Sequence, residues 1–78
     1  MINKEIGQRI AWLRKQVCNM TQAEFAKALG VAFPHTISEY EHGTFLPSPK
    51  RCQAIIKLAA QYQHQITHEW LRPDIYVD

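Results

Sequence analysis

The segment from Thr21 to Gly30 constrains the fold of this chain more than any other part of it. Thr21 followed three residues later by Glu24 is a capping box, in which each side chain accepts a hydrogen bond from the other residue's backbone N–H. Met20 before the cap and Phe25 at the fourth helical position form a hydrophobic staple. Gly30 supplies the left-handed residue that ends many helices. The sequence therefore predicts a short helix with both ends defined.

A second short helix is expected directly after this one. Pro34 suits a first helical position, because its missing N–H would be unpaired there anyway, and Gly43 marks the end of a helix from Pro34 to His42. Only Ile37 and Tyr40 form an apolar face on this helix, and its remaining positions are mostly polar. A helix that is polar on one side presents that side to solvent or to a ligand.

Three more helices follow from apolar periodicity and capping signals. The first spans about residues 3–17 and carries an apolar stripe of Ile2, Ile6, Ile10, Leu13 and Val17. Ser48-Pro49 begins a helix to about Tyr62, and Thr67 caps a short helix that ends before Pro73. The sequence thus predicts an all-α, compact five-helix domain over residues 1–73. The tail, residues 74–78, has strand-like composition.

Length and charge restrict the function of the chain. Its 78 residues fit one domain. Residues 1–58 carry eight Lys or Arg and four Asp or Glu, a net charge of +4, whereas residues 59–78 carry one Arg and three acids, a net charge of −2. A basic body suits a polyanionic partner. No apolar run approaches the roughly 20 residues of a membrane span, and the start lacks a secretory signal, so we expect a cytoplasmic protein without membrane contact.

Metal, cofactor and enzyme functions are not expected. Cys18 and Cys52 are interpreted as buried free thiols in a reducing compartment. His64 and His68 are four residues apart, a spacing that suits metal binding on a helix, but the cap Thr67 lies between them. No pattern of a nucleophile beside a base, and no phosphate-binding glycine loop, is visible.

Several short motifs occur in an order that is typical of one known family. They are Ile6–Ile10 (IGQRI), Leu13–Lys15 (LRK), Thr21–Ala26 (TQAEFA), Leu29–Val31 (LGV), Thr36–Ser38 (TIS) and Tyr40–Gly43 (YEHG). Through them the stretch from about Ile6 to Tyr62 resembles the Cro/repressor-type (lambda-repressor-like, XRE-type) helix-turn-helix regulators of phages and bacteria. The ending Leu71–Tyr76 (LRPDIY) is also similar to the tails of small Cro-like prophage regulators.

The resemblance implies a lambda-repressor-like DNA-binding domain whose helix-turn-helix spans about residues 21–42. It implies a sequence-specific transcriptional regulator, a Cro-like repressor that binds a palindromic operator in double-stranded DNA as a homodimer. Two segments, Val17–Met20 and Val31–Pro34, each hold one residue more than the family pattern. The second short helix, which would read the DNA sequence, could therefore begin later or dock on DNA at a changed angle.

The resemblance also implies roles for individual residues. Base contacts are expected from Pro34, His35, Thr36, Ser38 and Glu39 on the outer face of the second short helix. Phosphate contacts are expected from Thr21 and Gln22 at a helix N-terminus, with Arg9, Lys50 and Arg51 as further candidates. An ion pair between Arg14 and Glu41 is expected to tie the first long helix to the end of the reading helix.

The dimer contact and the wider function have alternatives. Ile75, Tyr76 and Val77 are expected either to pair as a strand across a dimer axis or to fold back on their own subunit, with Trp70 or Trp12 adding apolar contact. One alternative function is an antitoxin or other protein-binding module that masks a toxin, which an exposed apolar patch around Trp12, Trp70 and Tyr76 would favour. Another is an assembly domain without affinity for DNA.

Overall fold

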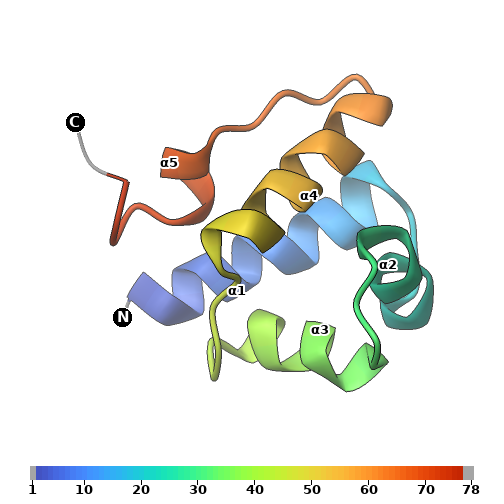
Figure 1. Cartoon of the computed structure of the whole chain (residues 1–78), viewed down its shortest axis with the longest axis horizontal. Helices are drawn as coiled ribbons and strands as arrows, with labels where there is room; N and C mark the ends of the chain where they lie inside the picture. Colours follow the sequence, from blue (N-terminus) through green and yellow to red (C-terminus); the bar gives the residue numbers. More distant parts are fainter. Residues whose placement is uncertain (1, 77–78) are drawn as a thin grey trace.

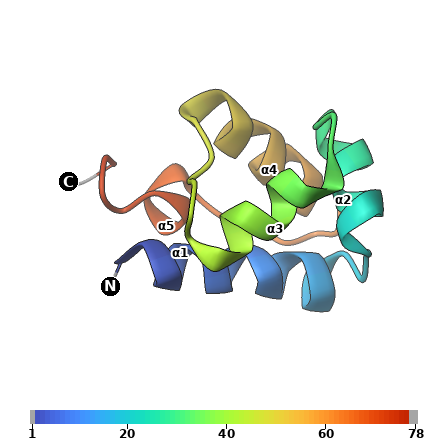
Figure 2. The same ribbon diagram turned by 90° about the horizontal axis from the view of Figure 1, so that it is seen from below.

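Helices make up the regular structure of the chain in a computed structural model, which describes residues 2–76 and the side chains of residues 3–76. The elements are α1 (Ile2–Trp12), the π-helical segment η1 (Leu13–Val17), α2 (Gln22–Leu29), α3 (Pro34–His42), α4 (Pro49–Gln61) and α5 (His68–Leu71). No strand occurs within residues 2–76, as the predicted all-α class requires. Figures 1 and 2 show α2 and α5 at opposite ends of the molecule, with α1 and α4 running between them.

The predicted helix starts rest on the expected side-chain caps. The Thr21 hydroxyl accepts a hydrogen bond from the backbone N–H of Glu24 at 3.1 Å, and the Thr21 N–H donates to the Glu24 carboxylate at 2.9 Å. The hydrogen bond from the Thr21 N–H to the carboxylate lowers the pKa of Glu24. Ser48 and Thr67 likewise accept from the third residue of α4 and α5, at 3.3 and 3.1 Å. Local chemistry therefore determines where these three helices begin.

The first predicted helix is not uniform, which corrects the expectation of one α-helix over residues 3–17. Its last turn is π-helical, and the N–H of Cys18 donates to the carbonyl of Leu13, five residues back, at 2.9 Å. A π-turn accommodates one additional residue in a helix. Asn19 then takes a positive φ of 52°, which asparagine tolerates well. The π-helical turn and Asn19 thus lie in and beside the segment Val17–Met20, which the family resemblance marks as one residue longer.

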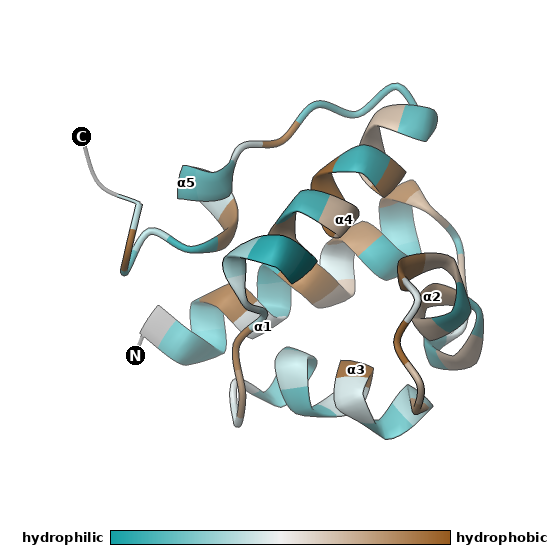
Figure 3. Ribbon diagram, viewed as in Figure 1, coloured by the Kyte–Doolittle hydropathy of each residue, from teal (hydrophilic) through white to brown (hydrophobic). Residues whose placement is uncertain are grey.

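A single core lies between the helices. The stripe residues Ile6, Ile10 and Leu13 are almost completely buried, and Val17 is partly buried. The other large members of the core are Phe25, Leu29, Ile37, Tyr40, Ile55, Leu58 and Leu71. Figure 3 shows apolar positions concentrated on the inward sides of α1 and α4. All five helices contribute to this core, so the position of each depends on the others.

Both cysteines are buried free thiols, as predicted. Burial raises the pKa of Cys18 and of Cys52 above the usual thiol value. The Cys52 thiol donates to the carbonyl of Pro47 at 3.6 Å. Both thiols therefore belong to the core and are poor nucleophiles there.

The described part of the tail folds back on its own subunit, one of the two conformations expected for it. Residues 73–75 form a turn in which the N–H groups of Ile75 and Tyr76 donate to the carbonyl of Arg72, at 3.1 and 2.9 Å. The Arg72 guanidinium pairs with the Asp74 carboxylate at 2.9 and 2.7 Å and donates to the Pro47 carbonyl at 2.6 Å. The strand-like composition of the tail does not produce a strand here, because the backbone N–H groups of Ile75 and Tyr76 find their hydrogen-bond acceptor within the turn.

Candidate nucleic-acid interface

Helix α3 presents a polar face to solvent. Its two anchors, Ile37 and Tyr40, are buried. On the other side Pro34 and His35 are exposed, and the remaining predicted base-contact residues, Thr36, Ser38 and Glu39, are half-buried. Figure 2 shows α3 lying across the near side of the molecule, with no other helix over it. The surface that the sequence predicted for reading DNA is therefore open.

The two helices of the motif are joined by a tight turn. Gly30 takes a φ of 73° at the end of α2, and its N–H donates to the carbonyl of Lys27 at 3.2 Å. The N–H of Val31 donates to the carbonyl of Ala26 at 2.8 Å, which completes the left-handed helix end. Helix α3 begins at Pro34, as predicted, and not later.

Arg14 in η1 and Glu41 near the end of α3 form the predicted ion pair. The Arg14 guanidinium donates to both carboxylate oxygens of Glu41, at 2.5 and 3.1 Å, and to the carbonyl of Met20 at 3.0 Å. The side-chain amide of Gln22 also donates to Glu41, at 3.1 Å. Each side chain of the ion pair is only 10% exposed. One carboxylate therefore connects η1 and α2 to the last turn of α3.

The other candidates for phosphate contact differ in how freely they can reach DNA. Thr21 and Lys50 are exposed at the first turns of α2 and α4. Arg51 is half-buried and donates one hydrogen bond to the carbonyl of Leu29 at 3.1 Å. Arg9 lies against α5, where its guanidinium donates to the carbonyl of Trp70 at 2.5 Å and covers the Trp70 ring at 5.5 Å. Arg9 is thus held apart from the first turn of α2.

Two residues at the polar face of α3, His42 and Phe33, were not predicted as site residues from the sequence. His42, in the last turn of α3, has its Nδ1 2.7 Å from the carbonyl oxygen of Ser38 and 3.3 Å from the Ser38 hydroxyl. Phe33, which directly precedes α3, is 61% exposed and stacks on the ring of His35. An aromatic residue next to the first proline of a polar helix was the available signal for Phe33.

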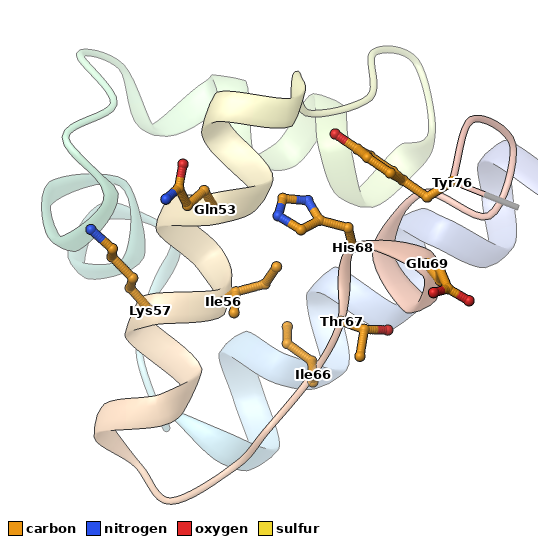
Figure 4. A pocket seen from close by; sticks show the side chains of 8 residues that line it. All are labelled: Gln53, Ile56, Lys57, Ile66, Thr67, His68, Glu69 and Tyr76. Carbon is orange, nitrogen blue, oxygen red and sulfur yellow. The ribbon is translucent and has the colours of Figure 1, made fainter. Parts of the chain in front are cut away.

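A groove of about 600 Å³ lies away from the motif, between α4 and the segment that leads into α5. Figure 4 shows Ile56 and Ile66 on its walls, with the His68 ring in the middle and Tyr76 at one end. The buried Nδ1 atom of His68 has no hydrogen-bond partner among the residues that the structure describes. The rings of His68 and Tyr76 lie 4.9 Å apart, so the folded tail forms part of this groove.

The two histidines considered for metal binding face different neighbours. His64 lies in the loop after α4 with its ring 5.2 Å from that of Trp12, whereas His68 opens α5. Within residues 2–76, no three His, Cys, Asp or Glu side chains gather where they could hold a metal ion. None of the helices described is long and apolar enough to cross a membrane.

Comparison with known proteins gives one match. A family model described as helix-turn-helix matches residues 10–59, which run from the end of α1 through most of α4 and include all of α2, the turn and α3. A search of curated proteins and a search of solved structures found no match.

Proposed function

Because this chain belongs to the helix-turn-helix family of DNA-binding regulators, we propose that it is a Cro-like repressor that binds a palindromic operator as a homodimer. Helix α3 enters the major groove, and the bound dimer covers a promoter and excludes polymerase. One observation carries this proposal: the polar side of α3 is open, while Ile37 and Tyr40 anchor its other side in the core.

The base contacts proposed for α3 follow from the chemistry of the side chains on its polar face. His35 is exposed in the first turn, where an imidazole N–H can donate to the N7 atom of a purine. Glu39 lies one turn further along, and its carboxylate can accept a hydrogen bond from the N4 amino group of cytosine. Pro34, Thr36 and Ser38 complete the surface that contacts the groove, with Ser38 held toward His42.

The phosphate contacts proposed for the flanking helices position α3 rather than specify sequence. Thr21 and Gln22 place the free N–H groups and the positive end of α2 toward one phosphate. Lys50 supplies a mobile positive charge. Arg51 uses one of its five donors for Leu29, so its other N–H groups remain for a second phosphate. Arg9 contacts phosphate only if it leaves Trp70.

A dimer is part of the proposal because one short helix contacts only a few base pairs. The proposed dimer contacts are Ile75, which is 49% exposed, together with Tyr76 and Trp70. Val77, the fourth residue of this set, lies outside the described residues. The folded turn 73–75 leaves Ile75 exposed, so this contact requires no strand across the dimer axis.

Selection of DNA from a random pool tests the proposed function. We expect an enriched palindrome with half-site centres about 10 base pairs apart, or a multiple of that spacing. The His35→Ala variant should lose preference at one position of each half-site. The matched control Gln53→Ala, exposed on α4 at the groove of Figure 4, should select the same palindrome. A folded protein that enriches no sequence would overturn the proposal.

A second function, binding of a toxin or another protein, is favoured by one cluster of aromatic side chains. Trp12 is 43% exposed, and its ring lies 6.2 Å from that of Trp70 and 5.2 Å from that of His64. Tyr76, expected in the same patch, contacts His68 instead. For this function, Trp12→Ala should abolish a stoichiometric complex with a co-expressed neighbouring protein while the selected DNA stays the same.

A further inference from the structure

Phe33 is an exposed aromatic residue that directly precedes α3. In the proposed function, this end of α3 enters the major groove. Phe33 is 61% exposed, the largest exposed fraction among the large apolar side chains that the structure describes. Its backbone is extended, with φ −128° and ψ 131°, directly before the first residue of α3. It is not part of the core, so packing within the subunit does not account for an aromatic ring at this position.

The orientation of the Phe33 ring is defined by stacking on the ring of His35. The two ring centroids are 5.5 Å apart and the ring planes differ by 26°. Stacking covers one face of the imidazole and leaves its nitrogen-bearing edge free to bond a base. The N-terminal residues of a recognition helix are those that reach base edges, and both rings lie there.

We propose that Phe33 reads the C5-methyl group of a thymine in the major groove, beside the base that His35 contacts. This inference rests on the proposed function. Among the four bases only thymine carries a methyl group in the major groove, and phenylalanine can contact it. A spacing of 5.5 Å between the rings spans one to two base steps of about 3.4 Å, so the thymine lies within two base pairs of the His35 contact.

Replacement of thymine by deoxyuridine tests the proposal, because the exchange removes the methyl group and leaves base pairing intact. In the operator selected above, each thymine is replaced in turn, and the dissociation constant of the wild-type protein is measured. At one thymine in each half-site, a single replacement should raise the dissociation constant about fourfold, which is the effect of losing one buried methyl-sized group. That thymine should lie within two base pairs of the position at which His35→Ala relaxes preference.

Two variants separate a thymine contact from a general effect on binding. Phe33→Ala removes the contact from both subunits of the dimer, so it should bind the thymine operator about 16-fold more weakly, and it should no longer distinguish thymine from deoxyuridine at that position. Phe45→Ala is the matched control, since Phe45 is 59% exposed but lies beyond the other end of α3. It should keep the full sensitivity to deoxyuridine.

Each result has one consequence. If the wild-type protein binds every deoxyuridine operator as tightly as the thymine operator, the inference about Phe33 is wrong and the proposed function stands. If Phe33→Ala keeps the sensitivity, another residue contacts the methyl group and the inference is also wrong. If no operator can be selected, both proposals fail.

Discussion

Gly7 in α1 lies directly against the backbone carbonyl group of Glu41 in α3. A Cβ atom at this position would overlap that carbonyl and would lie 2.7 Å from the carbonyl oxygen of Tyr40. Both neighbours are backbone, so neither can turn aside as a flexible side chain can. The two helices therefore cross with their backbones in contact, and this crossing determines how far α3 stands from the core.

The substitution Gly7→Ala should destabilise the protein, although alanine is the better helix former by about 1 kcal/mol. Overpacking against rigid backbone costs about 1–3 kcal/mol, and a domain of this size is marginally stable. Urea unfolding followed by circular dichroism would measure the loss. Gln8→Ala, at the adjacent exposed position, is the control and should change little. A Gly7→Ala protein as stable as the control would contradict the close crossing.

The buried pair of Arg14 and Glu41 should show strong coupling in a double-mutant cycle. Removing either partner leaves a charge in a site where both side chains are 10% exposed, which typically costs about 3–5 kcal/mol for a buried pair. Arg14→Met and Glu41→Leu should each destabilise strongly, while the double variant should lose much less than the sum of the two. Additive losses in urea unfolding would mean that the two side chains act independently.

Lys50 should contribute to DNA affinity through charge alone. Each phosphate neutralised on double-stranded DNA adds about 0.9 to the slope of log affinity against log salt concentration. Because both subunits of the proposed dimer lose this contact, Lys50→Ala should reduce that slope by about 1.8 and should weaken binding to selected and random DNA equally. Lys57→Ala, which removes a charge at the groove of Figure 4, is the control and should leave the slope unchanged. Equal slopes for all three proteins would rule out a Lys50 contact.

Asp74 should stabilise the folded tail at neutral pH but not in acid. Hydrogen bonds from the Arg72 guanidinium lower the pKa of the Asp74 carboxyl in the folded state, below the unfolded value of about 3.9. The stabilisation is therefore complete above the unfolded pKa and is lost as pH falls through the folded pKa. Asp74→Asn should cost at most about 1 kcal/mol at pH 7, because water screens this pair, and nothing in strong acid. A difference that persists unchanged at pH 2 would exclude the ion pair as its cause.

Removal of residues 74–78 tests whether the tail contributes to the proposed dimer. If it does, the dimer dissociation constant measured by sedimentation should rise at least about tenfold, equivalent to roughly 1.4 kcal/mol. Asp74→Asn, which keeps the apolar side chains of the tail, should dimerise more tightly than the truncated protein. An unchanged constant after truncation would place the dimer contact elsewhere.

Local signals in the sequence were sufficient for the helix-turn-helix segment. The capping box, the proline at the start of α3 and the two left-handed glycines act within a few residues of themselves, so their effects can be predicted without knowledge of the rest of the fold. The same holds for the anchors Ile37 and Tyr40, because helical periodicity alone separates the inner from the outer face of α3.

Contacts between distant parts of the chain could not be derived in this way. Arg9 was a candidate for phosphate contact, but it is held by Trp70, 61 residues away, and no local rule links the two. The π-helical turn at η1 was not predicted either, because the apolar stripe Ile2–Val17 indicates one continuous helix. The tail forms a turn because Arg72 reaches Asp74 and the Pro47 carbonyl together.

The sequence by itself therefore determined the bounds of α2 to α5, to within about a residue, and the polar side of α3, since these follow from interactions within one or two helical turns. Only the tertiary structure decided which charged groups are free and which are held. It also decided that Phe33 stacks on His35 at an open surface and that Gly7 allows α3 to approach α1. Those outcomes depend on packing between helices, where the position of each surface is set by all the others at once.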